Sequence, residues 1–289
     1  MRSHADTTMD LQRLLETPGA LPSIPRVIAL GLTELEQEAP DLMRVSALLS
    51  DEPVMTARLL QVANSARYQL SQRIGTVAQA LAVLGLSEVR EMLLLAAVAS
   101  AFRRVGTVDM RQFWRYSLNT ARLMRQLARS RASLLRQSSA SPHTVGLVHA
   151  LGELVMQRGL PARQRALLDQ HYDIFAPDRA TAEMRLLGYS YAQVGAGFAR
   201  TWNLPQELIR VVEQHDDPFA QGNSHEPLAA LLHMAAWRCR AREMAYDEDA
   251  LAETYPEVAA LALRLQLDEV LAHDPVEWAS ESEVEALAA

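Results

Sequence analysis

Apolar side chains recur every three to four residues along most of the chain, and this helical spacing limits the possible folds more than any other feature. Met55, Leu59 and Val62 form one such stripe, which follows a helix-start signal at Pro53. Other prolines that mark helix starts are Pro25, Pro40, Pro161, Pro177 and Pro205. No run of useful length alternates apolar and polar residues, as a half-buried strand would. The sequence therefore predicts an all-α fold, a multi-helix array in two packed halves.

The composition fits a helical protein with an ample core. Hydrophobic residues make up 49% of the 289 residues and aromatic residues only 6%, so leucine, alanine and valine fill the interior. The single cysteine, Cys239, cannot form an internal disulfide, which is typical of a reducing compartment. Its arginine neighbours could lower the thiol pKa, although a lone helical cysteine is more often simply packed. The most apolar stretch, residues 92–102, is about half the length that spans a bilayer. We expect a cytoplasmic protein with no membrane partner.

Charge is distributed unevenly along the chain. The sequence contains no lysine, which excludes a Walker-type phosphate loop and Schiff-base chemistry. The formal net charge is −7. Residues 103–136 nevertheless contain nine arginines and one acid, whereas residues 243–289 contain thirteen acids and one arginine. The chain therefore has a basic middle segment and an acidic C-terminal segment.

The stretch VGLVHALGELVMQRG, residues 145–159, places His149 and Glu153 four positions apart in an apolar run. Four residues apart on a helix, two side chains share a face and can approach one ion or one proton. One interpretation is half of a metal or acid–base site. The other is a core helix that contains a histidine.

Several segments together resemble the HDOD domain family. They are LPSIPRVI, LLSDEPVMTARLLQVANSARY, IGTVAQALAVLGLSEVREMLLL, VGLVHALGELV and YAQVGAGFARTWNLPQELIRVVEQHDDP. This family is an all-helical relative of the HD metal-dependent phosphohydrolases, and it generally serves as a bacterial signalling module, often without enzyme activity. The resemblance implies an N-terminal helical subdomain at 1–105, an HD-like subdomain with a degenerate metal site at 106–242, and an acidic helical segment at 243–289.

An HD hydrolase holds its divalent metal with several His and Asp side chains. The resemblance places two histidines and two aspartates of that set where this chain has Tyr116, Ala150, Tyr191 and Ala236. His149 remains. The pair His215-Asp216 aligns outside the ligand set, and we interpret it as a helix end followed by a turn. The resemblance therefore predicts no catalytic residue, no metal site and no cofactor.

The remaining polar residues predict a vestigial pocket. Its candidate members are Tyr116, His149, Glu153 and Tyr191. A hydrogen bond from His149 to Glu153 or to Tyr116 would satisfy a buried histidine. A functional alternative is that the four side chains line a shrunken pocket that binds a small ligand.

Five arginines fall within roughly 80° of one another on the helix expected from Asp109 to about Arg131. They are Arg111, Arg115, Arg122, Arg125 and Arg129. The favoured interpretation is a solvated face or one paired with the acidic C-terminal segment. The alternative is a docking surface for an acidic protein or for phosphates. Nucleic acid is disfavoured because the whole chain is acidic and carries no known nucleic-acid motif.

The leading functional hypothesis is a non-enzymatic bacterial signal-transduction module that binds a signalling protein or a small ligand. One alternative is an HD-type phosphohydrolase of a nucleotide or cyclic dinucleotide, with His149, Glu153 and His215 as its ligands. A second alternative is an arginine-mediated binder of nucleic acid or dinucleotide. The sequence indicates no oligomeric state.

Overall fold

All regular secondary structure of the described residues is helical, which confirms the predicted all-α class. The computed structural model describes residues 9–17, 19–20, 25–102, 105–106, 108–135, 138, 140–171, 173–202, 204–223, 225–272 and 278–288. Two compact units divide the chain, one at 22–103 and the other comprising 1–21 and 104–289. Over the described ranges, no helix is both long enough and apolar enough to span a bilayer.

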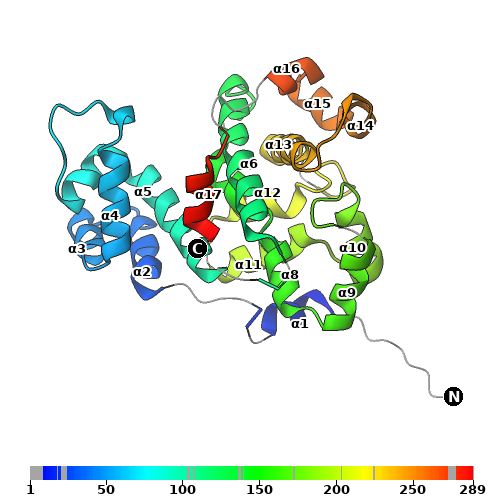
Figure 1. Ribbon diagram of the computed structural model, residues 1–289, viewed down its shortest axis with the longest axis horizontal. Coiled ribbons are helices and arrows are strands. Elements are labelled where there is room, and N and C mark those ends of the chain that lie inside the picture. The colour runs from blue at the N-terminus through cyan, green and yellow to red at the C-terminus, as the bar shows by residue number, and fades with distance from the viewer. Residues whose placement is uncertain are drawn as a thin grey trace. The chain divides into compact units, whose positions relative to one another are not determined.

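The smaller unit is built around one long helix. Its elements are α2 (Arg26–Leu35), α3 (Leu42–Ser50), α4 (Pro53–Ala63), the short 3-10 helix η1 (Ala66–Tyr68) and α5 (Val77–Ala101). Helix α5 packs against α2, α3 and α4 (Figure 1). Leu49, Leu59 and Leu93 are fully buried at these contacts. Gly85 interrupts the helical backbone of α5 with a φ of 78°, a conformation that glycine adopts readily.

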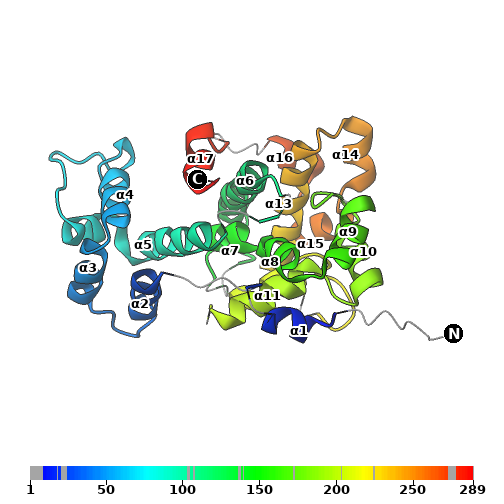
Figure 2. The ribbon, with the colours of Figure 1, turned by 60° about the horizontal axis from the view of Figure 1, so that its bottom comes forward.

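The larger unit contains the remaining helices. They are α1 (Leu11–Glu16), α6 (Met110–Ser130), α7 (Pro142–Val148), α8 (Leu151–Gly159), α9 (Ala162–His171), α10 (Arg179–Leu187), α11 (Tyr191–Thr201), α12 (Gln206–Gln214), α13 (Pro227–Glu243), α14 (Glu248–Thr254), α15 (Glu257–Leu263), α16 (Leu267–Ala272) and α17 (Glu281–Ala288). Helix α6 packs against α7 and α13 (Figure 2). Helix α11 packs against α8 and α12, the latter labelled in Figure 1. Trp114, Leu123 and Leu127 of α6 are fully buried.

Helix α1 lies outside the compact unit of residues 22–103, although the predicted subdomain 1–105 includes both. It packs against α8 and α11 of the larger unit, so the first helix and residues 22–103 belong to different compact units. Part of the predicted range, residues 1–8, 18, 21–24 and 103–104, lies outside the described residues.

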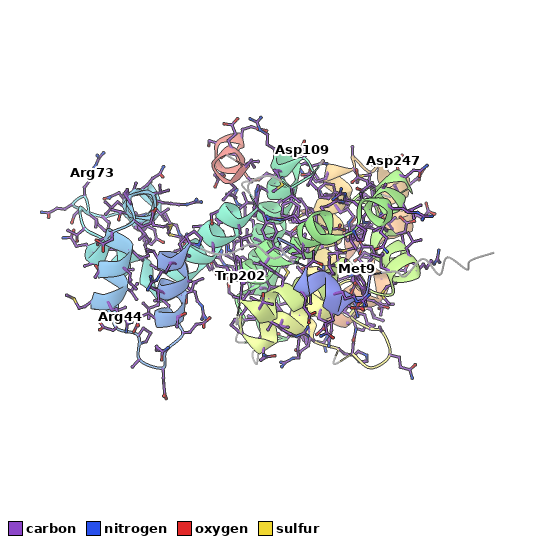
Figure 3. The ribbon with its side chains drawn as sticks, turned by 90° about the horizontal axis from the view of Figure 1, so that it is seen from below. Met9, Arg44, Arg73, Asp109, Trp202 and Asp247 are labelled. Carbon is purple, nitrogen blue, oxygen red and sulfur yellow. The ribbon has the colours of Figure 1, made fainter. Side chains whose placement is uncertain are left out.

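Side-chain caps explain why several helices begin where they do. The Asp109 carboxylate accepts hydrogen bonds from the backbone N–H groups of Arg111 and Gln112, and so starts α6. Asp247 caps α14 in the same way, through the N–H of Ala250; Figure 3 labels both aspartates.

The described parts of the acidic C-terminal segment are mainly helical and pack within the larger unit. Helix α17 lies beside α6 in Figures 1 and 2, and α15 packs against α13. Val284 and Leu287 of α17 are buried, so apolar contact as well as charge holds this helix in place.

Candidate functional site

Tyr116 and His149 form a buried hydrogen-bonded pair in the larger unit. Helix α6 supplies Tyr116, and His149 is the residue that ends α7. His149 Nδ1 lies 2.7 Å from the Gly146 carbonyl oxygen, and its Nε2 lies 3.0 Å from the Tyr116 hydroxyl. A carbonyl oxygen only accepts, so Nδ1 carries the hydrogen and Nε2 accepts from the tyrosine. Both nitrogens of the ring are therefore occupied.

Tyr191 and His215 repeat this arrangement. His215 ends α12, its Nδ1 donates to the Val212 carbonyl oxygen at 2.6 Å, and its Nε2 lies 3.0 Å from the Tyr191 hydroxyl. The interpretation of His215 as a helix-end residue was incomplete, because the side chain is only 1% exposed and belongs to the same cluster as His149. We call these four side chains the Tyr–His cluster: Tyr116, His149, Tyr191 and His215.

All four groups of the Tyr–His cluster are held in their neutral forms. Burial lowers the pKa of His215 to about 3. The pKa of His149 lies well below its ordinary value, mainly because of burial and also because His215 is nearby. Burial raises the pKa of the Tyr116 hydroxyl to about 12 and also raises that of Tyr191. The cluster is thus a neutral hydrogen-bonded core at physiological pH.

Glu153 has a different partner from the one its spacing suggested. The helix breaks at His149 and Ala150, and α8 starts only at Leu151, so the prediction that His149 and Glu153 share one continuous helical face is wrong. Glu153 instead lies 3.3 Å from the Arg179 guanidinium, which donates to Glu183 at 2.7 Å. Arg179, Glu153 and Glu183 are each at most 3% exposed. They form a buried ionic cluster beside the tyrosines.

A close approach of two helices produces this geometry. A Cβ added at Gly152 of α8 would lie only 1.9 Å from the Tyr191 carbonyl oxygen and 2.7 Å from the Gly195 nitrogen of α11. Only glycine allows this contact between backbones. The contact sets Tyr191, at the start of α11, close to the end of α7, where His149 lies.

The arginines of α6 mostly contact the chain's own acids. Arg115 donates to both carboxylate oxygens of Glu243, at 2.9 and 2.6 Å. Two further arginines pair with glutamates of α17: Arg111 lies 3.2 Å from Glu285, and Arg122 pairs with Glu283. The two other members of the predicted surface are Arg125, which is half-buried, and Arg129, which is exposed. Three of the five candidate surface residues are therefore paired with acids of the C-terminal segment, although Arg111 remains mostly exposed.

The family model of the HDOD domain matches residues 21–218. The chain belongs to the HDOD domain family. Among curated proteins, this HDOD chain is 22% identical over 215 residues to an uncharacterized protein of Treponema pallidum, covering 74% of the chain and 41% of the relative. It is 27% identical over 124 residues to YuxH of Bacillus subtilis, covering 43% and 29%. The matched regions thus span less than half the length of these curated relatives.

Solved structures show the same fold. An HDOD domain protein of unknown function from Geobacter sulfurreducens superposes with a TM-score of 0.67 at 22% identity, covering 96% of this chain and 98% of that one. A candidate phosphohydrolase from Shewanella amazonensis gives 0.70 at 24% identity, with 98% and 99% covered. A candidate signal transduction protein from Marinobacter aquaeolei gives 0.62 at 22%, with 97% and 61% covered.

The HDOD chain's residues do not fit the metal that the HD relationship implies. Ala150 and Ala236 offer no oxygen, and His149 has both ring nitrogens hydrogen-bonded within the protein. Over the described ranges, no group of three or more His, Cys, Asp or Glu side chains could hold a metal ion.

Sequence reasoning missed a cation in the HDOD site. Arg240 of α13 lies beside the Tyr–His cluster, because it lines one small cavity together with Tyr116 and Tyr191. Its neighbour Cys239 is buried, and burial raises the pKa of that thiol to about 12. Arg238 and Arg242 do lower this pKa, but burial outweighs them, so the thiol is packed and protonated, as the favoured interpretation predicted. Within the arginine-rich stretch WRCRARE, only the fold distinguishes Arg240 from its neighbours.

Proposed function

We propose that this HDOD chain is a regulatory module of bacterial signal transduction that works by binding a partner or ligand and catalyses no reaction. The observation that carries the proposal is the Tyr–His cluster. Where an HD hydrolase would need ligands with free lone pairs, Tyr116 and Tyr191 donate to His149 and His215. Carboxylates that would complete a metal cage are replaced by alanine at 150 and 236. The name of the Marinobacter neighbour agrees with a signalling role.

Two assays on the full chain, purified without chelator, test the absence of catalysis. Elemental analysis should find iron, manganese and zinc far below one atom per chain. Hydrolysis of phosphomonoesters and cyclic dinucleotides should stay at the buffer rate with Mg²⁺, Mn²⁺ or Fe²⁺ present. A His149→Ala variant is the matched control, because a genuine metal site would lose its metal with this histidine. Near-stoichiometric metal in the wild type, lost in His149→Ala, would overturn the proposal in favour of a phosphohydrolase.

The arginine-mediated alternative has its own signature. Binding of nucleic acid or a dinucleotide through α6 would weaken steeply with salt, and more gently once Arg115, Arg122 and Arg125 are replaced by alanine. We expect no such binding, because Glu243 and Glu283 already pair with two of these arginines. A location in the cytoplasm is part of the proposal, supported by the single reduced cysteine.

A further inference from the structure

Arg240 places a positive charge at the centre of the Tyr–His cluster. It lines one small cavity together with Tyr116 and Tyr191, and, after the larger effect of burial, its charge contributes to lowering the pKa of both His149 and His215. Each of these neighbours is neutral at physiological pH. These four groups can therefore solvate the guanidinium but do not neutralise it, and Glu153 and Asp216, which line the cavities beside it, form no ion pair with it.

Arg240 differs in this respect from three other arginines of the larger unit, which form ion pairs. Arg115 pairs with Glu243, Arg131 with Glu269 and Arg179 with Glu183. Arg240 forms no ion pair with any carboxylate of the described residues, and its Nε is buried without a hydrogen-bond acceptor. A largely buried cation without a counter-ion, and a buried donor without an acceptor, each cost free energy. An anion bound beside Arg240 would relieve both costs.

A cavity provides the space. It has a volume of about 130 Å³ and is lined by Arg240, Tyr191, His215, His233, Trp237 and Asp216, among others. Several water molecules would fit there, whereas pockets for drug-sized ligands measure roughly 300–1,000 Å³. The size suits one phosphate or carboxylate group, the two anions that the arginine fork binds best.

Asp216 is the one acid on the cavity wall. Its carboxylate oxygens already accept from Ser190 Oγ at 2.6 Å and from the Asp217 backbone N–H at 3.0 Å. It therefore serves the loop after α12 and forms no ion pair with Arg240. Its charge nevertheless opposes a bound anion, which gives the site a residue whose removal should strengthen binding.

We propose that Arg240 and the cavity beside it bind a small oxyanion, a phosphate or carboxylate group, free or attached to a small molecule. This inference deepens the proposed function, since it names the ligand class on which a non-catalytic module would act. Binding and hydrolysis are measured separately, so either can fail alone.

Calorimetry and thermal unfolding of the full chain test the site, with sodium phosphate and sodium acetate as probes and sodium chloride at matched ionic strength as the reference. We expect phosphate or acetate to bind saturably and raise the Tm, with chloride ineffective. Whichever probe binds identifies the oxyanion class. Arg240→Gln should weaken that binding at least tenfold, and Asp216→Asn should strengthen it. Arg242→Gln is the matched control, because Arg242 of the same helix stacks on Trp278 and should leave binding unchanged.

Structural damage is separated from loss of binding by two further readouts. Without anion, Arg240→Gln should be at least as stable as the wild type, because the variant removes a largely buried charge that forms no ion pair. Should that variant fail to fold, Arg240→Lys keeps the charge without the fork and should bind several-fold more weakly. Equal responses to phosphate, acetate and chloride, or an Arg240 variant that folds and binds like the wild type, would overturn the proposal.

Discussion

The imidazole rings of His149 and His215 meet edge to face, with their centres 5.3 Å apart. Two buried rings at this distance cannot both carry a proton without strong repulsion, and each ring already donates one hydrogen to a carbonyl and accepts one from a tyrosine. The neutral state of both histidines is therefore built into the packing of α6, α7, α11 and α12.

The first prediction concerns the dependence of stability on pH. The folded pKa of His215, about 3, lies below the ordinary value of about 6.5, so as the pH falls the unfolded chain takes up the proton first. The stabilisation is thus complete above about pH 6.5 and is lost as the pH falls toward 3. Between pH 7.5 and 5.5 one such histidine accounts for about 1.4 kcal/mol. When the pH is lowered from 7.5 to 5.5, urea unfolding should show that the unfolding free energy of the wild type falls by that much more than that of His215→Gln.

The exposed His225 provides the control for this measurement. His225→Gln should keep the pH dependence of the wild type. If the His215 and His225 variants behave alike, the buried imidazole does not control acid stability.

The second prediction concerns the tyrosine hydroxyls. Tyr191→Phe leaves Nε2 of His215 buried without a donor, which should lower the free energy of unfolding by about 1–3 kcal/mol. Tyr255→Phe is a suitable comparison, since its hydroxyl has only a long contact of 3.5 Å to the Leu265 carbonyl. Chemical unfolding of the two variants should separate them clearly. Equal losses would mean that the Tyr191 hydroxyl contributes little.

A third prediction concerns the buried ionic cluster. Arg179→Met would leave Glu153 and Glu183 without a counter-charge, and we expect a loss of about 3–5 kcal/mol. Burial raises the pKa of both carboxyl groups, and Glu153 further raises that of Glu183. Glu153→Gln removes this repulsion and keeps an acceptor for Arg179, so its loss should stay within about 1 kcal/mol. Urea unfolding of both variants measures the contrast; a larger loss for Glu153→Gln would contradict the assignment.

The fourth prediction concerns the contact between α6 and α17. Arg122→Glu and Glu283→Arg should each loosen α17, and the double variant should restore part of the loss. For a half-exposed pair we expect a coupling energy of about 0.2–1 kcal/mol. Hydrogen exchange of the α17 amides in all four proteins measures it. Additive effects, with no recovery in the double variant, would mean that the Arg122–Glu283 pair does not help to hold the helix.

Local signals were sufficient to predict most of the helices but not the site. The Asp109 cap and Pro53 are short-range features, and α6 and α4 begin where those residues indicate. The break between His149 and Leu151 has no such signal, because apolar spacing runs through it without interruption. It depends on a tertiary contact, the approach of Gly152 to the Tyr191 carbonyl, which one sequence does not reveal.

The vestigial pocket illustrates the same limit. The resemblance to the HDOD family brought Tyr116, His149 and Tyr191 to notice, and the structure places them together. The resemblance did not predict the contact between Glu153 and Arg179, which lies 26 positions away in the chain. The sequence also does not show which arginine near Cys239 faces the site. Only the packing of α13 places Arg240 inward and stacks Arg242 on Trp278.

Because Cys239 is buried, the rate at which its thiol is labelled reports local opening of the protein. The only thiol lies on α13, directly beside Arg240, and is 1% exposed. An alkylating reagent can reach it only when α13 separates from its neighbours, so the labelling rate measures how often the centre of the larger unit opens. Any ligand that stabilises this centre must slow the labelling, and the slowing can be followed without introducing a probe.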